Sequence, residues 1–98
     1  MKTEKGETAI DQVFVLRTLY GGKPMESKFK KMLDDAHEKV RKKFGRLAPQ
    51  ADELVKTCTL KNETALAIVV ATEFERGLSS EASMVDALNV AKYFVDNF

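Results

Sequence analysis

The chain lacks the features of a secreted, disulfide-bonded or membrane-spanning protein. It has 98 residues, with one cysteine, two prolines, five glycines and no tryptophan. The single cysteine, Cys58, cannot form a disulfide within the chain, and the polar start MKTEKGETAID has no apolar region such as a signal peptide needs. The longest apolar run, Ala65 to Ala71, is far shorter than the roughly 20 residues of a membrane span. We therefore expect a reduced, cytoplasmic protein with no membrane contact.

Motifs for catalysis and cofactor binding are absent as well. The sequence has no Walker phosphate loop, no GxGxxG fingerprint and no CxxC pair. The only histidine, His37, has Asp34 and Glu38 near it, whereas a di-iron bundle needs two Glu-x-x-His helices and further carboxylates. We expect His37 to lie at the edge of the core without a chemical role, and Cys58 to act as a small buried hydrophobic residue. We predict no enzymatic activity, no metal site and no cofactor.

The composition is that of one globular domain. Hydrophobic residues make up 44% of the chain and charged residues 32%, which lies outside the range of disordered sequences. A chain of this length suffices for one domain and is too short for two ordinary ones. We expect residues 1–7 to be a flexible N-terminus and residues 8–98 to form a single helical domain.

The clearest helix signal spans residues 25–44. Its apolar residues recur at three- and four-residue spacing and form a stripe about 120° wide, as in a helix packed on a core. Pro24 suits the first turn of this helix, and Gly45 suits the position just after its end. Pro49 then opens a short helix over residues 50–57.

A further helix is predicted over residues 62–76. Asn62 is a suitable N-cap and Gly77 a suitable stop. The middle of this segment, ALAIVVA, is apolar nearly all round, which predicts the central, buried helix of the domain. Ser79 or Ser80 caps a last helix that runs to the C-terminus.

The segment 8–20 has two interpretations. Its sequence VFVLRTLY is rich in residues that favour strands, yet strict alternation of apolar and polar residues fails. The following Gly-Gly-Lys-Pro is a helix stop, so we predict a helix of about 12 residues. The fold expected is therefore all-α, a single compact domain of four to five helices with helix 62–76 central. The alternative is an α+β fold with a strand at 12–19.

Charge is unevenly distributed along the chain. The net charge is +1, but residues 23–46 carry a net +5 and residues 47–98 a net −4. On a helical projection five cations fall in one row about 27 Å long. We call them the cationic row: Lys28, Lys31, Lys39, Lys42 and Arg46. The row is interpreted either as a solvated face or as a surface for a polyanion or an acidic protein partner. Direct base readout is disfavoured because the row lacks Asn, Gln and interleaved aromatic residues.

The last helix has a wide apolar surface. Its apolar residues span about 160°, whereas packing on one neighbour needs about 100°. The helix is therefore either wedged between two helices of its own domain or partly buried in a homodimer, with Phe94 and Phe98 at the self-association surface.

Together these features favour a small, non-catalytic, cytosolic regulator or adaptor that acts by macromolecular binding, as a homodimer. Factors encoded by phages and mobile elements have this size and composition. The alternative is sequence-nonspecific nucleic-acid binding, to DNA or RNA, through the basic face of helix 25–44.

Overall fold

The structure of this protein is a computed structural model, and it describes residues 24–97. These residues are 88% helical and contain no strand. The elements are α2 (Ser27–Lys43), the short 3-10 helix η1 (Gly45–Leu47), α3 (Ala48–Lys61), α4 (Thr64–Gly77) and α5 (Glu81–Asn97). The all-α prediction is confirmed. The predicted helix over residues 8–20, and its alternative as a strand at 12–19, lie outside the described residues.

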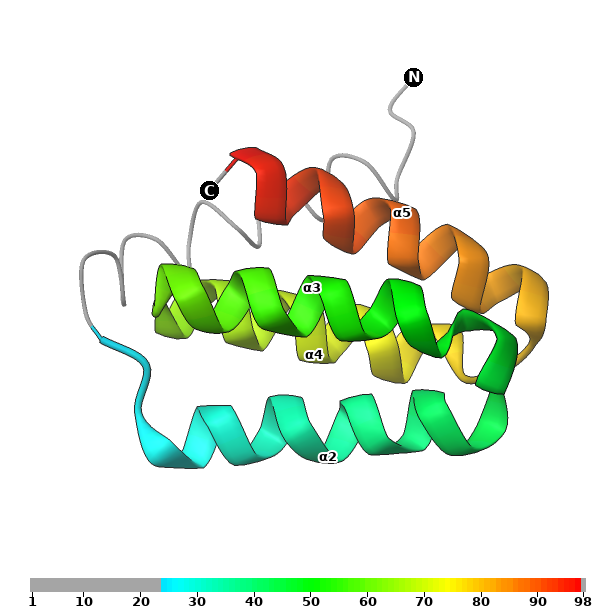
Figure 1. Cartoon of the computed structure of the whole chain (residues 1–98), viewed down its shortest axis with the longest axis horizontal. Coiled ribbons are helices and arrows are strands. Elements are labelled where there is room, and N and C mark those ends of the chain that lie inside the picture. The colour runs from blue at the N-terminus through cyan, green and yellow to red at the C-terminus, as the bar shows by residue number, and fades with distance from the viewer. Residues whose placement is uncertain (1–23, 98) are drawn as a thin grey trace, which may run out of the picture.

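The four α-helices form a bundle with α4 in its middle (Figure 1). Helices α2 and α4 run in the same direction, and α3 and α5 run in the opposite direction. Helix α4 packs between α2 and α5, and α3 lies against all three. This order leaves the outer side of α2 at one edge of the bundle.

Helix α2 forms where its apolar spacing predicts it. Leu33, Ala36 and Val40 are the buried residues of this helix, at three- and four-residue spacing. The observed helix begins at Ser27 and ends at Lys43, one to two residues inside the predicted bounds.

The start of α2 is held by the corner between α3 and α4 rather than by a capping side chain of its own. The Met25 backbone N–H donates to Oδ1 of Asn62 (3.2 Å), and the Glu26 N–H donates to Oγ1 of Thr64 (3.3 Å). The Thr64 hydroxyl in turn donates to the Pro24 carbonyl (3.0 Å). These bonds satisfy backbone N–H and C=O groups at the start of α2, and they connect the first turn of α2 to the first turn of α4.

Helix α3 is longer than predicted. It runs to Lys61 instead of ending near residue 57, because Ala51, Leu54 and Cys58 continue one buried face and no glycine or proline interrupts it. Asn62 ends the helix in the left-handed conformation (φ 50°, ψ 48°). The prediction that Asn62 caps the start of the next helix is therefore wrong: asparagine tolerates this conformation well and serves as the C-cap of α3.

Helix α4 is the central helix, as predicted. Ten of its 14 residues are buried. Gly77, predicted to follow this helix, is instead its last residue. It lies against α5, where there is no room for a side chain. A Cβ at this position would lie 2.8 Å from Cβ of Ala87 and 2.9 Å from Cα of Met84. Glycine therefore allows α5 to approach α4 closely.

Helix α5 begins after the predicted cap. The Ser83 backbone N–H donates to Oγ of Ser80 (3.1 Å), so Ser80 is the N-cap. The helix packs on both α4 and α3. Its buried residues are Met84, Ala87, Leu88, Ala91, Phe94 and Val95. Most of the described part of the apolar surface of this helix is thus buried within the chain.

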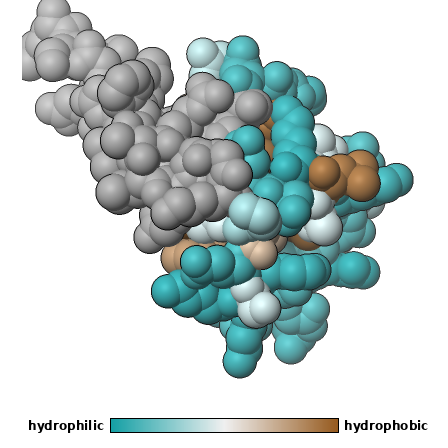
Figure 2. Space-filling model, turned by 90° about the vertical axis from the view of Figure 1, so that its left-hand side faces the viewer, coloured by the Kyte–Doolittle hydropathy of each residue, from teal (hydrophilic) through white to brown (hydrophobic). Residues whose placement is uncertain are grey.

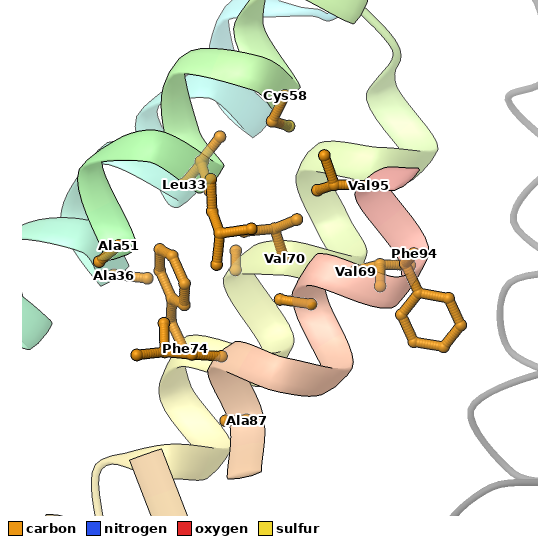
Figure 3. Packing of buried hydrophobic residues seen from close by; sticks show 14 of the residues in the cluster. Leu33, Ala36, Ala51, Cys58, Val69, Val70, Phe74, Ala87, Phe94 and Val95 are labelled. Atoms are coloured by element: carbon orange, nitrogen blue, oxygen red, sulfur yellow. The ribbon is translucent and has the colours of Figure 1, made fainter. Parts of the chain in front are cut away.

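The buried side chains of the four helices form one continuous cluster. Figure 3 shows Leu33 of α2, Cys58 of α3, Val70 and Phe74 of α4 and Val95 of α5 converging on the space between the helices. Leu33, Cys58, Val70 and Phe74 have no exposed surface. Each large apolar side chain buried here contributes about 1.5–3 kcal/mol.

One buried carboxylate lies at the contact between α4 and α5. Glu73 is 7% exposed, and its Oε1 lies 2.7 Å from Nη2 of Arg76. The same guanidinium group reaches Asp86 of α5 at 3.1 Å. The hydrogen bond to Glu73, and then that to Asp86, raise the pKa of Arg76 against its partial burial. The charge of Glu73 is therefore paired rather than isolated in the core.

Replacing Gly77 with alanine is expected to destabilise the fold by about 1–3 kcal/mol, because the added methyl group overpacks the α4–α5 contact. The nearest atom of the backbone is Cα of Met84, which moves only if α5 moves. Urea denaturation followed by circular dichroism measures the change. Gly45→Ala is the matched control, since no atom lies within 4 Å of a Cβ built there. Equal losses for the two variants would contradict the close-contact role of Gly77.

Candidate functional site

The cationic row belongs to α2, which lies at the edge of the bundle (Figure 1), and to η1. All five of its side chains are exposed. Four of them, the lysines, belong to α2 and span about 21 Å along the helix axis at the rise of 1.5 Å per residue. The buried residues of α2 are Leu33, Ala36 and Val40, so core packing and the cationic face use different positions of the helix.

Arg46 does not continue the helical row, contrary to the projection from the sequence. Helix α2 ends at Lys43, and Phe44 leaves the helical conformation (φ −130°, ψ 70°). Arg46 therefore lies in η1, where its Nη2 is 3.2 Å from Oε1 of Glu81 at the start of α5. The break at Phe44 turns this cation toward another helix of the same chain.

Lys39 is also paired with another helix. Its Nζ donates a hydrogen bond of 2.8 Å to Oε1 of Glu75 in α4. This hydrogen bond, and then the negative charge of Glu75, raise the pKa of Lys39 above its ordinary value. Both partners are about half exposed, so the pair lies at the surface.

The remaining lysines of the row have weaker or no ion pairs. Lys42 lies 3.6 Å from Glu38 one turn earlier, and Lys28 lies 3.9 Å from Glu26. Lys31 forms no ion pair with a described residue. The row therefore has an open end, at Lys28 and Lys31, and an end that is joined to α4 and α5.

Acidic side chains lie between the cations. Asp34 is 3.9 Å from Lys30, and Asp35 and Glu38 are exposed on the same helix. The face of α2 is thus mixed in charge with an excess of cations. Such a face favours a partner with a lower density of negative charge over one with a higher density.

The other flank of α2 holds His37. Its Nε2 lies 2.5 Å from Oδ1 of Asp52 in α3, and Nη1 of Arg41 lies 3.5 Å from the same oxygen. The imidazole is half-buried, with its centroid 6.3 Å from that of Phe74. The predicted position of His37 at the edge of the core is confirmed. Within residues 24–97 no group of three or more His, Cys, Asp or Glu side chains is arranged to hold a metal ion.

Cys58 is fully buried, as predicted. Burial, and then the negative charge of Glu63, raise the pKa of its thiol from 9.0 to about 12. The thiol therefore stays protonated at physiological pH, and the thiolate that reacts as a nucleophile does not form.

The residues predicted for self-association are only partly described. Phe94 is 6% exposed and belongs to the buried cluster, and Phe98 lies outside the described residues. Figure 3 shows the Phe94 ring on the side of α5 that faces away from Phe74, and Tyr93 contacts it edge-on at 5.6 Å between centroids. Self-association through these two residues stays a prediction.

Exposed apolar side chains in the described part of the chain are scattered. They are Met32 on α2, Leu60 on α3, and Val85 and Tyr93 on α5. One end of the molecule is seen in Figure 2, where the coloured surface is mainly hydrophilic and the apolar side chains stand apart. Isolated apolar side chains are normal on a protein surface and indicate no particular partner. None of the helices described is long and apolar enough to cross a membrane.

The sequence did not indicate which carboxylates meet the row. Glu75 and Glu81 are separated from Lys39 and Arg46 by more than 30 residues, and no helical spacing rule connects them. The sequence pointed only to the net negative charge of the second half of the chain. The pairing follows from the packing of α2 on α4 and from the turn at η1.

The buried thiol makes the stability of the fold sensitive to alkaline pH. In the unfolded chain Cys58 ionises near 9.0, whereas in the fold it keeps its proton to about 12. The stabilisation is complete below pH 9 and is lost as the pH rises toward 12, because unfolding then releases a proton. Between about pH 8 and pH 10 we expect the free energy of unfolding to fall about 1.4 kcal/mol more for the wild type than for Cys58→Ala.

Urea denaturation of both proteins at the two pH values measures this difference. The comparison between variants removes the contributions of the lysines and tyrosines, which titrate in both proteins. A difference in stability that does not change with pH would contradict the protonated thiol.

Comparison with protein-family models, with characterised proteins and with solved structures finds no match for this chain. Its geometry therefore identifies a fold and a candidate interaction surface, and the assignment of a function rests on the residues of that surface.

Proposed function

We propose that this protein is a small, non-catalytic regulator or adaptor of the cytosol that binds an acidic protein through the cationic row. The observation that carries the proposal is the open end of the row. Lys28 and Lys31 are exposed at the edge of the bundle, and neither pairs with another of the described helices. Among the described residues Lys28 contacts only neighbours in the chain, Glu26 at 3.9 Å and the Phe29 ring at 5.0 Å from its centroid, and Lys31 forms no ion pair. These cations are available to a partner's carboxylates.

The charge pattern of α2 favours a protein over a nucleic acid. Asp34, Asp35 and Glu38 lie among the cations and would repel duplex DNA more than an acidic polypeptide, because the duplex carries one negative charge per about 1.7 Å and a polypeptide at most one per residue of about 3.5 Å. A protein surface offers separated carboxylates and can also present cations to these acidic residues. Glu75 and Glu81 of the chain itself give the geometry in which a carboxylate on a helix meets a cation of the row.

The state of Cys58 supports a non-catalytic role and a reducing compartment. A buried thiol with a pKa of about 12 is not an activated nucleophile. A single unpaired cysteine is also typical of proteins that function where thiols stay reduced.

A second candidate function is sequence-nonspecific nucleic-acid binding through the same row. The observation in its favour is the placement of four exposed lysines along one helix edge, a length over which a phosphate backbone carries several charges. Binding assays separate the two candidates, because the first predicts tighter binding to an acidic polypeptide and the second predicts tighter binding to DNA.

A homodimer is the form in which we propose that the protein acts. Its support is the width of the apolar surface that the sequence predicts for the last helix, about 160°, which exceeds what packing on one neighbour needs. Because Phe94 is buried, changing it threatens the fold, so light scattering of the wild type over a range of concentrations is the direct test. A monomer at all concentrations would contradict the homodimer and leave the cationic row unaffected.

The binding proposal predicts that Lys28→Gln with Lys31→Gln weakens binding to poly-L-glutamate about two- to thirtyfold, because each exposed ion pair is worth about 0.2–1 kcal/mol. Fluorescence anisotropy with labelled poly-L-glutamate measures the dissociation constant at several salt concentrations. Lys56→Gln with Lys92→Gln removes the same charge from α3 and α5 and is expected to bind as the wild type does.

A short DNA duplex serves as the second probe in the same assay. Tighter binding to DNA than to poly-L-glutamate, with a log–log salt slope that flattens by about two in the Lys28/Lys31 variant, would assign the row to nucleic acid instead. Equal weakening by the control variant, or no binding to either probe, would contradict the proposed function of the row.

A further inference from the structure

Two of the five cations in the cationic row are paired with carboxylates of other helices of the chain. Lys39 meets Glu75 of α4 at 2.8 Å, and Arg46 meets Glu81 of α5 at 3.2 Å. Both pairs join elements that are distant in sequence, so they exist only in the folded protein.

These two pairs differ from the local pairs of the row. Lys42–Glu38 and Lys28–Glu26 connect neighbours along one segment and measure 3.6 and 3.9 Å. The pairs between elements are shorter, and Lys39 donates a hydrogen bond to its partner. Lys39 and Arg46 at one end of the row are therefore held to other helices by charge-assisted contacts, whereas Lys28 and Lys31 at the other end have no such contact with a described helix.

The occupied pairs lie at the surface. The side chains of Glu75 and Glu81 are 48% and 47% exposed, and those of Lys39 and Arg46 are 56% and 82% exposed. A carboxylate of a partner can therefore approach both cations, but it meets a cation whose charge is already compensated. It must displace the internal carboxylate or leave that cation unused.

We infer that Glu75 and Glu81 act as internal competitors of an acidic partner for Lys39 and Arg46. The inference rests on the proposed function, and it adds a built-in restraint to it. A partner binds first at Lys28 and Lys31, and the fold limits how far along the row its carboxylates extend. The chain thus binds an acidic polypeptide more weakly than the five cations would allow.

The test is Glu75→Gln combined with Glu81→Gln, with poly-L-glutamate as the probe. Removing the two carboxylates is expected to tighten binding about two- to thirtyfold, because the probe no longer has to break two exposed ion pairs of the free protein. The salt dependence is expected to become steeper, because two more cations then contact the probe. Circular dichroism checks that the variant keeps its helical content.

A matched control has the same change in net charge at a distance from the row. Glu53→Gln in α3 combined with Asp96→Asn in α5 removes two negative charges, as the test variant does, and leaves Lys39 and Arg46 paired. The control is expected to bind as the wild type does. Equal tightening in both double variants would overturn the inference, because net charge alone would then explain the gain.

Acetylation footprinting with mass spectrometry adds a readout at individual lysines. Bound poly-L-glutamate is expected to protect Lys28 and Lys31 in the wild type, and Lys39 as well in the Glu75/Glu81 variant. Protection of Lys39 that is equal in both proteins would overturn the inference.

The failure of this inference is distinct from the failure of the proposed function. If the wild type binds through Lys28 and Lys31 while the Glu75/Glu81 variant binds equally well, only the internal competition is wrong. If neither protein binds the probe, both statements are wrong, because there is then no acidic partner with which the carboxylates compete for the cations.

Discussion

The burial of α4 between its neighbours is the constraint on which the rest of the structure depends. Its side chains Leu66, Val70 and Phe74 have no exposed surface, and the helix packs on α2, α3 and α5. A helix that is apolar nearly all round cannot remain at a surface, so the other helices must enclose it. Gly77 sets how near α5 comes, because a side chain there would collide with Met84 and Ala87. The position of α2 at the edge of the bundle follows from this arrangement.

The charge of the chain is organised by the same packing. Helix α2 carries most of the excess positive charge, and the following helices carry the negative charge. Bringing α2 against α4, and turning the chain at η1, places Lys39 and Arg46 beside Glu75 and Glu81. The fold therefore pairs one end of the cationic row with other helices and leaves Lys28 and Lys31 without such a pair among the described residues. Exposed pairs of this kind add little stability, and under the proposed function they decide which cations a partner can use.

Polar groups in the interior are satisfied by contacts within a helix and between helices. Glu73 is paired with Arg76, which also reaches Asp86 of α5, and Thr64 joins the start of α4 to the start of α2. In the described part of the chain no buried side-chain nitrogen or oxygen lacks a hydrogen-bond partner. These contacts specify how the helices are aligned, because hydrogen bonds require particular distances and angles. Apolar packing alone specifies the alignment less closely.

Much of the described fold was determined by the sequence alone. The period of the apolar residues identified α2, the uninterrupted apolar segment identified α4 as central, and Ser80 marked the start of α5. Local signals failed where one residue suits two roles. Asn62 is a good N-cap in sequence, yet its backbone is left-handed and ends α3.

The candidate site divides in the same way. The sequence determined that α2 carries a cationic face, because helical spacing alone places its lysines on the side away from the apolar stripe. Only the tertiary structure decided that Arg46 leaves the row, that Lys39 pairs with Glu75, and that Lys28 and Lys31 remain open. Those outcomes depend on contacts between residues far apart along the chain, and such contacts are set by how the helices pack rather than by the spacing within any one of them.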